Sequence, residues 1–113
     1  MHELTLAERA IGIVEAAARK AEARRVTRIR LSIGALAHVD PDTMQYCCEV
    51  VSRDTLAAGA QIEVVRAPGL AWCATCSAEV ALKQIGEPCP QCGGYQLNIT
   101  DGDQMQVVDI SIE

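Results

Sequence analysis

Two cysteine pairs in the second half of the chain constrain its fold most strongly. Cys73 and Cys76 form one Cys-x2-Cys pair, Cys89 and Cys92 form the other, and twelve residues separate the two pairs. Two thiolates spaced in this way can sit on one tight turn and supply half of a tetrahedral sulfur shell. Two such turns facing each other complete a closed four-cysteine site, in which metal binding and folding are coupled.

Zinc is the metal expected at these four thiolates. Pro90 stiffens the second turn, and the pair Gly93-Gly94 allows the backbone to leave it with positive φ. A single iron ion is the alternative, because Cys-Pro-x-Cys-Gly turns also occur in rubredoxins. Two disulfides are a second alternative, but the sequence has no secretion signal to support them. A thioredoxin-type redox site is a third, but it requires a Cys-x2-Cys pair at the start of a helix, and no helical pattern follows either pair. A closed four-thiolate zinc site would be structural.

The charge balance and the N-terminal sequence exclude several classes of function. Ten Lys and Arg residues stand against fifteen Asp and Glu, a net charge of −5, which argues against nucleic acid as a partner. No apolar run approaches the roughly 20 residues that span a bilayer, and the N-terminus does not resemble a signal peptide. We therefore expect a soluble cytoplasmic protein without a membrane partner, in which paired cysteines bind metal.

Helical periodicity extends from about Leu6 to Arg24, with small apolar residues on one face. Thr5 and Glu8 have the spacing of a capping box, which places the helix start just after Leu4. This start leaves residues 1–3 as a short tail outside the helix.

A second helix and three strands follow from the remaining patterns. Asp40 as N-cap and Pro41 at the first helical position predict a helix to about Thr55. Cys47 and Cys48 on this helix are expected to be small buried hydrophobes. Alternating apolar and polar residues predict strands over residues 27–34, 61–67 and 104–113, the last with a bulge between Val107 and Val108.

The order of these elements predicts an α+β fold in which two helices cover a three-stranded sheet. A zinc-ribbon-like four-cysteine module is inserted before the last strand. We expect residues 1–68 plus 98–113 to form the α+β domain and residues 69–97 to form the zinc-binding domain. The α+β domain is then formed from both ends of the chain, and the zinc-binding domain interrupts it in the sequence.

The start Met1-His2-Glu3, followed by a helix and later by the CxxC…CPxCGG module, resembles the HypA/HybF family. Its members are nickel-insertion accessory proteins for nickel–iron hydrogenases, and the resemblance covers the whole chain. It implies a nickel metallochaperone that binds Ni(II) at its N-terminus and delivers it to the hydrogenase large subunit. Zn(II) would be structural.

The resemblance implies that Met1, His2 and Glu3 form the nickel site. Nickel(II) favours square-planar nitrogen coordination, and these residues offer a free amine, backbone nitrogens and one imidazole. Asp40 is a possible further nickel ligand, although its capping role is an equally good explanation. His38 is expected to be a solvent-facing loop residue.

The family works with a separate nickel-dependent GTPase, and this chain has no G-x-x-x-x-G-K-[ST] loop of its own. The implied partners are that GTPase, the hydrogenase large subunit precursor and urease accessory proteins. No set of residues indicates an enzyme. The alternative function is a zinc-ribbon protein-interaction module without nickel chemistry; for a nucleic-acid-associated ribbon, the expected basic stripe is not present.

Overall fold

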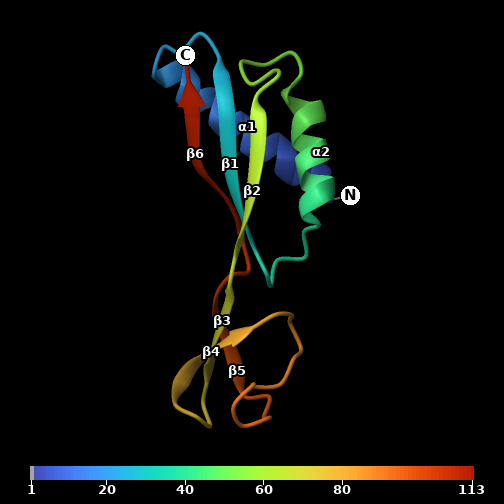
Figure 1. Ribbon diagram of the computed structural model, residues 1–113, viewed down its shortest axis with the longest axis vertical. Coiled ribbons are helices and arrows are strands. Elements are labelled where there is room, and N and C mark those ends of the chain that lie inside the picture. The colour runs from blue at the N-terminus through green and yellow to red at the C-terminus, as the bar shows by residue number, and fades with distance from the viewer. Residues whose placement is uncertain (1) are drawn as a thin grey trace. The chain divides into compact units, whose positions relative to one another are not determined.

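The computed structural model describes residues 2–113 and has the predicted α+β class (Figure 1). Its elements, in chain order, are α1 His2–Lys20, β1 Val26–Gly34, α2 Pro41–Ser52, β2 Gln61–Ala67, β3 Gly69–Cys73, β4 Ala78–Leu82, β5 Leu97–Asp101 and β6 Met105–Ile112. The strands form two sheets of three strands each, with the orders β2-β1-β6 and β4-β3-β5. In the part of the chain that the structure describes, no helix is long and apolar enough to cross a membrane.

Contacts divide the chain into two compact units. The first contains the described residues up to Ser32, together with Val39–Val65 and Gln106–Glu113. The second contains Ile33–His38 and Arg66–Met105. The boundaries 68/69 and 97/98 stay a prediction for where independently folding domains begin and end.

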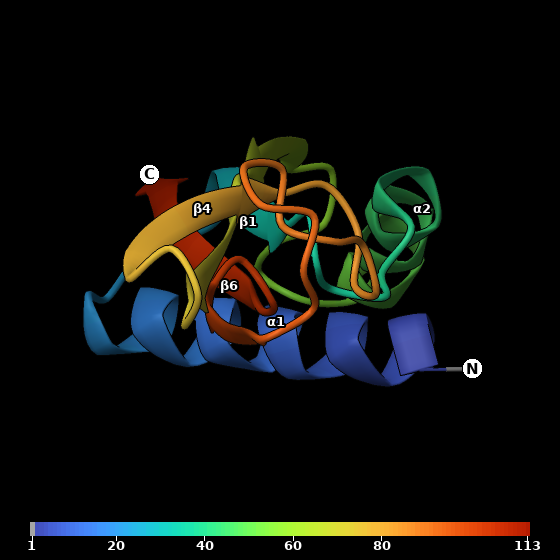
Figure 2. The same ribbon diagram turned by 90° about the horizontal axis from the view of Figure 1, so that it is seen from below.

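The first unit is built on a core of small and branched side chains. In α1 the buried residues recur every three or four positions, so one face of the helix packs against the sheet: Ala7, Ala10, Ile11, Val14 and Ala18. Helix α1 crosses one side of the sheet, and α2 packs against α1 (Figures 1 and 2). On β1, Ile29 and Leu31 are fully buried. Alanines on α1 compensate for the absence of Phe, because they allow close packing without large side chains.

The predicted start and end of the first helix were wrong. Helix α1 begins at His2 and not after Leu4, so His2 and Glu3 belong to its first turn. The carboxylate of Glu3 favours this start, because it lies near the positive end of the helix dipole. The helix ends at Lys20 because Glu22 adopts a left-handed φ of 57° and Ala23 donates its N–H to Ala18 O at 2.9 Å. No glycine marks this stop in the sequence.

The predicted start of the second helix is confirmed. Asp40 has an extended backbone, and its carboxylate accepts hydrogen bonds from the Asp42 N–H at 3.2 Å and from Thr43 Oγ1 at 2.8 Å. Pro41 stands at the first helical position, where its missing N–H costs nothing. The helix ends at Ser52, slightly before the predicted Thr55.

Three glycines allow backbone segments of the second unit to approach closely. A Cβ on Gly34 would lie 2.0 Å from Gly102 O, and a Cβ on Gly102 would lie 2.3 Å from Pro68 O. A Cβ on Gly69 would lie 2.6 Å from Leu82 O and 2.5 Å from the side chain of Leu36. The Leu36 N–H donates to Gly102 O at 2.8 Å, so these segments are also held by hydrogen bonds. No side chain fits between them.

We expect Gly34→Ala to lower the free energy of unfolding by about 1–3 kcal/mol, because the added methyl group collides with backbone that cannot move aside. Gly12→Ala is the matched control. Gly12 lies in α1, and a Cβ added there would meet nothing within 4 Å, so this change should raise stability by roughly 0.4–1 kcal/mol. Urea unfolding of both variants measures the difference. Equal stabilities would contradict the close approach.

Candidate metal site

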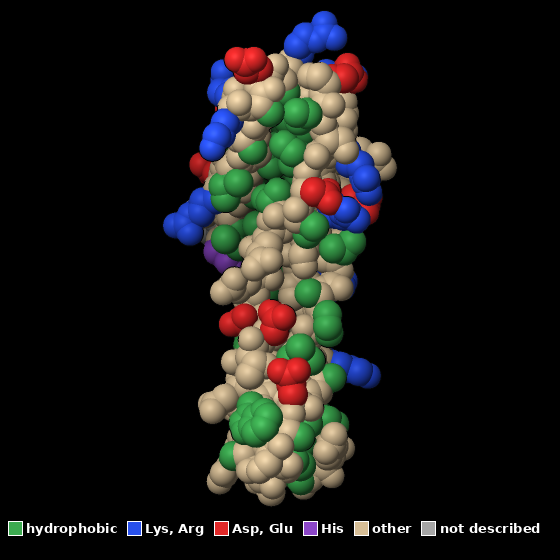
Figure 3. Space-filling view, turned by 90° about the vertical axis from the view of Figure 1, so that its left-hand side faces the viewer, with side chains coloured by type: hydrophobic (Ala, Val, Ile, Leu, Met, Phe, Trp, Pro, Cys, Tyr) green, Lys and Arg blue, Asp and Glu red, His purple; other side chains and the backbone are tan. Residues whose placement is uncertain are grey.

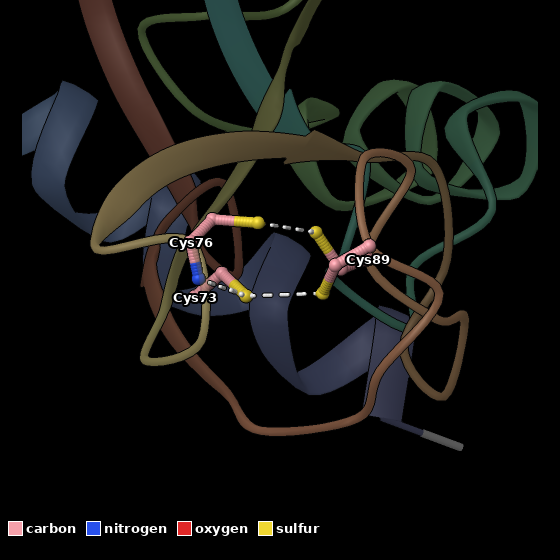
Figure 4. Close-up of side chains that lie close together, drawn as sticks. Cys73, Cys76 and Cys89 are labelled. Carbon is pink, nitrogen blue, oxygen red and sulfur yellow. Dashed lines mark hydrogen bonds between the residues drawn. The ribbon is translucent and has the colours of Figure 1, made fainter.

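The four predicted cysteines come together in the second unit. Cys73 ends β3, Cys76 lies in the turn to β4, and Cys89 and Cys92 lie in the loop before β5. The four Sγ atoms all lie within 4.8 Å of one another. Figure 4 shows Cys73 and Cys76 facing Cys89 across this cluster.

The sulfur–sulfur distances fit a tetrahedral metal ion. Cys73 Sγ lies 3.7 Å from Cys92 Sγ, and Cys76 Sγ lies 3.9 Å from Cys89 Sγ. Four thiolates around a zinc ion with Zn–S bonds of about 2.3 Å would stand about 3.8 Å apart. A disulfide would need about 2.05 Å, and all four cysteines are free. The donor set and its spacing therefore fit a closed four-thiolate metal site.

Backbone N–H groups point at the sulfurs and favour thiolates. The Cys76 N–H donates to Cys73 Sγ at 3.4 Å. Hydrogen bonds from the backbone of Cys92, and secondarily of Gln91, lower the pKa of Cys89 to about 7. By contrast, the pKa of Cys76 is raised to about 12, mainly by its hydrogen bond with the Cys92 side chain. Thiols crowded in this way share protons, and a bound metal cation would replace those protons.

The loop that carries the second pair is shaped by its own backbone. The Cys89 N–H donates to Gly94 O at 2.7 Å, and the Gly93 N–H donates to Cys89 O at 2.8 Å. Gly93 has a φ of 74°, as its place after the turn predicts, whereas Gly94 is not in the positive region. One glycine of the pair is therefore required by conformation.

The cysteines are also part of the small core of this unit. Cys73 and Cys89 are buried, Cys76 is half-buried and Cys92 is exposed. The core cluster contains few other side chains: Leu36, Ala71, Val80 and Leu82, with Leu97 packed against it. A core of this size stabilises a fold only weakly. Bound metal would supply the missing stabilisation, and the exposed position of Cys92 leaves the site reachable from solvent.

The proposed nickel ligands lie at the start of α1. Met1 lies outside the described residues. His2 is exposed in the first helical turn, and its Nδ1 lies 3.4 Å from Glu3 Oε1. Within residues 2–113, His2, Glu3 and Asp40 do not gather into a cluster of three ligand side chains. The predicted site relies on main-chain nitrogens, so its donors differ in kind from those of the four-cysteine cluster.

The other sequence candidates have structural explanations. The Asp40 carboxylate is occupied by the N-cap of α2, and His38 is exposed. Cys47 and Cys48 are buried, as predicted, and Cys48 Sγ lies 3.8 Å from the sulfur of Met44. Burial raises the pKa of Cys48 to about 11, so this residue remains a neutral thiol in the core.

Comparisons with known proteins agree with this structure over the whole chain. The family model described as hydrogenase/urease nickel incorporation, metallochaperone, hypA matches residues 1–112. Hydrogenase maturation factor HypA 2 of Bradyrhizobium diazoefficiens is 50% identical over 113 residues, with all of both chains covered. Hydrogenase maturation factor HypA of Rhodopseudomonas palustris is 46% identical, again with both chains fully covered.

A solved structure supports the same fold. The solution structure of the Ni metallochaperone HypA from Helicobacter pylori matches with a TM-score of 0.71. The match covers 97% of this chain and 96% of that chain, at 20% sequence identity. The matched family model and the close relatives show the relationship, and the structural match shows the shared fold. The chain therefore belongs to the HypA family of hydrogenase and urease nickel-incorporation metallochaperones, which are maturation factors and not enzymes.

Proposed function

We propose that this protein binds Ni(II) at its N-terminus and delivers it to the precursor of a hydrogenase large subunit. Zn(II), held by Cys73, Cys76, Cys89 and Cys92, would stabilise the second unit. The observation that carries the proposal is the whole-chain family match, combined with four thiols at metal-ligand spacing. Reduced thiolates at this site suit a cytoplasmic protein.

The proposed nickel donors are Met1, His2 and Glu3. The first four N–H groups of a helix have no carbonyl partner within the helix, so the backbone nitrogens of His2 and Glu3 are free to deprotonate and bind a metal. The exposed His2 imidazole and the Met1 amine would complete a square of nitrogen donors.

The position of this site favours release of the metal. A helix N-terminus carries partial positive charge, which opposes a bound cation. Deprotonated backbone nitrogens, together with the nearby Glu3 carboxylate, offset that charge. The imidazole lies in solvent, so an incoming ligand from a recipient protein can reach it. Exposed coordination of this kind suits transfer better than storage.

We propose three kinds of partner: a nickel-dependent GTPase of hydrogenase maturation, the hydrogenase large subunit precursor and urease accessory proteins. The matched family is described by both hydrogenase and urease nickel incorporation. This chain has no phosphate-binding loop motif, so nucleotide hydrolysis would be the work of the GTPase.

The zinc assignment predicts one zinc ion per purified chain, measured by elemental analysis. Cys92→Ala should remove the metal and unfold the second unit, because three remaining thiolates hold zinc less well and the remaining core is small. The signals of the first unit should persist in the NMR spectrum. Cys47→Ala is the control: it removes a buried thiol far along the sequence from the cluster and should keep its zinc. Iron in the native protein, or full zinc in Cys92→Ala, would be incompatible with this assignment.

The nickel assignment predicts that affinity depends on a free N-terminus. Adding one residue before Met1, or changing His2→Ala, should weaken nickel binding at least tenfold by calorimetry, or about 1.4 kcal/mol. Both variants should keep the zinc site. His38→Ala, which alters the only other histidine, should bind nickel normally.

The variant Asp40→Asn distinguishes the role of Asp40 as the N-cap of α2 from its possible role as a nickel ligand. Asparagine is a good N-cap, so stability should be preserved while the carboxylate charge is lost. Unchanged nickel affinity would assign Asp40 to capping alone, and weaker affinity would add it to the nickel site. If the extended chain and His2→Ala both bind nickel as tightly as the native chain, the N-terminal site is wrong.

Delivery is tested by loading the protein with nickel and mixing it with metal-free large subunit precursor. The native protein should raise the nickel content of the precursor well above that reached with His2→Ala at the same total nickel. A chelator added as competitor distinguishes direct transfer from release into solution. Equal uptake with both chains would show that the N-terminal site does not deliver the metal.

A further inference from the structure

The small sheet β4-β3-β5 of the second unit has one face that does not pack into the core of that unit. Alternate residues of the central strand β3 point to opposite faces of the sheet. Ala71 and Cys73 point to the core and are fully buried, so Leu70 and Trp72 point to the other face. Trp72 is 45% exposed. The only tryptophan of the chain therefore lies on the central strand of an open sheet face.

Two carboxylates lie on this open face, one on each side of β3. In an antiparallel pair, directly opposed residues point to the same face and have Cβ atoms about 5 Å apart. Glu79 of β4 stands opposite Trp72, and Asp101 of β5 stands opposite Leu70. Both acids are exposed. The open face therefore combines an apolar strip along β3 with one negative charge on each flank.

A hydrogen bond that crosses the sheet holds Glu79 beside Trp72. Thr100 Oγ1 donates to Glu79 Oε2 at 3.1 Å. Thr100 lies on β5 and Glu79 lies on β4, so the bond passes over the central strand between them. The pairing of β3 with β5 shifts between Leu70 and Ala71, which makes Thr100 the extra residue of a β-bulge. Bulges re-aim side chains, and this one directs Thr100 at the carboxylate.

The two acids of this face form no ion pair with any Lys or Arg of residues 2–113. In the sheet of the first unit, by contrast, arginines of β1 pair with acids of the neighbouring strands, as Arg30 does with Asp109. The second unit contains four acids and two bases, a net charge of −2. Figure 3 shows several acidic side chains among apolar ones on this unit, in the lower half of the view. The charge of the open face is thus complementary to a cationic partner.

We propose that this face binds a lysine or arginine side chain presented by an extended segment of a partner protein. The cation would lie over the ring of Trp72 and form an ion pair with Glu79. A cation within about 6 Å of an aromatic ring is attracted to its face, and tryptophan attracts it most strongly. Residues two apart in an extended segment point the same way, so a second cation would reach Asp101. Binding at this face requires neither nickel nor the N-terminus, but it does require a folded second unit.

The same two carboxylates select against other kinds of segment. An uncharged segment lying on Trp72 would cover Glu79 without pairing it, and covering an unpaired carboxylate is costly. An acidic segment would bring like charges together on the sheet, which is also unfavourable. A basic segment offsets both costs, and the aliphatic part of its side chain can contact Leu70.

Trp72 reports the test directly, because tryptophan fluorescence comes from this residue alone. The zinc-loaded, full-length protein is titrated with a blocked heptapeptide of alternating threonine and arginine, followed by fluorescence and calorimetry. The control peptide carries citrulline in place of arginine, which has nearly the same shape and no charge. We expect the arginine peptide to bind about tenfold more tightly and to weaken as salt is raised. Equal binding of both peptides, or binding of neither, would overturn the proposal.

Two variants with the same change of charge test the position of the site. Glu79→Gln removes the charge and keeps an oxygen that can accept from Thr100, so it should weaken binding of the arginine peptide about tenfold. Glu87→Gln is the matched control. Glu87 belongs to the same unit but lies beside the core residue Leu82, and glutamine can also accept the Lys83 N–H that Glu87 accepts at 2.9 Å. Equal weakening by both variants would indicate attraction to the net charge alone and would contradict a site on this face.

Two further changes test the ring and the sign of the charge. Trp72→Leu keeps an apolar side chain but removes the ring, so calorimetry should show weaker binding of the arginine peptide. Glu79→Lys should abolish that binding and should improve binding of a peptide with glutamate in place of arginine. Circular dichroism and zinc content confirm that each variant is folded. Native affinity for the arginine peptide in both folded variants would show that the peptide binds elsewhere.

Discussion

The fold of the second unit depends on the four sulfur atoms of Cys73, Cys76, Cys89 and Cys92, which lie together in its core. Its sheet is short, and its core consists of a few aliphatic side chains around Cys73 and Cys89. The four Sγ atoms lie within 4.8 Å of one another, and hydrogen bonds within the cluster raise the pKa of Cys76 and lower that of Cys89. A divalent ion would turn this crowding into bonds. A metal bound in this unit would thus take the place of the hydrophobic core that a larger domain has.

The core of the first unit is packed without phenylalanine, which the chain lacks. Alanines on the buried face of α1 allow the helix to lie close to the sheet, where Ile29 and Leu31 of β1 are buried. On β6, at the edge of the same sheet, Val108 and Ile112 remain exposed.

The early start of α1 changes the physical setting of the proposed nickel site. A free tail would offer donors that must be ordered by the metal itself, at a cost in conformational entropy. A helix that begins at His2 already orders the backbone nitrogens of His2 and Glu3. A nickel ion bound there would lie at the positive end of the helix dipole, so in the proposed site ordering would favour binding and charge would favour release.

Local chemistry explains what the sequence determined by itself. The CxxC spacing, the Asp40-Pro41 start of α2 and the alternation in β1 and β6 depend on neighbouring residues, so the α+β class and the cysteine cluster were predictable. Tertiary structure decided the rest. The end of α1 at Glu22, the close approach of Gly34 and Gly102, and the pairing of β5 with β3 depend on contacts between distant segments, which no local pattern records. The uncovered edge of β6 belongs with them, because coverage is a property of the assembled sheet.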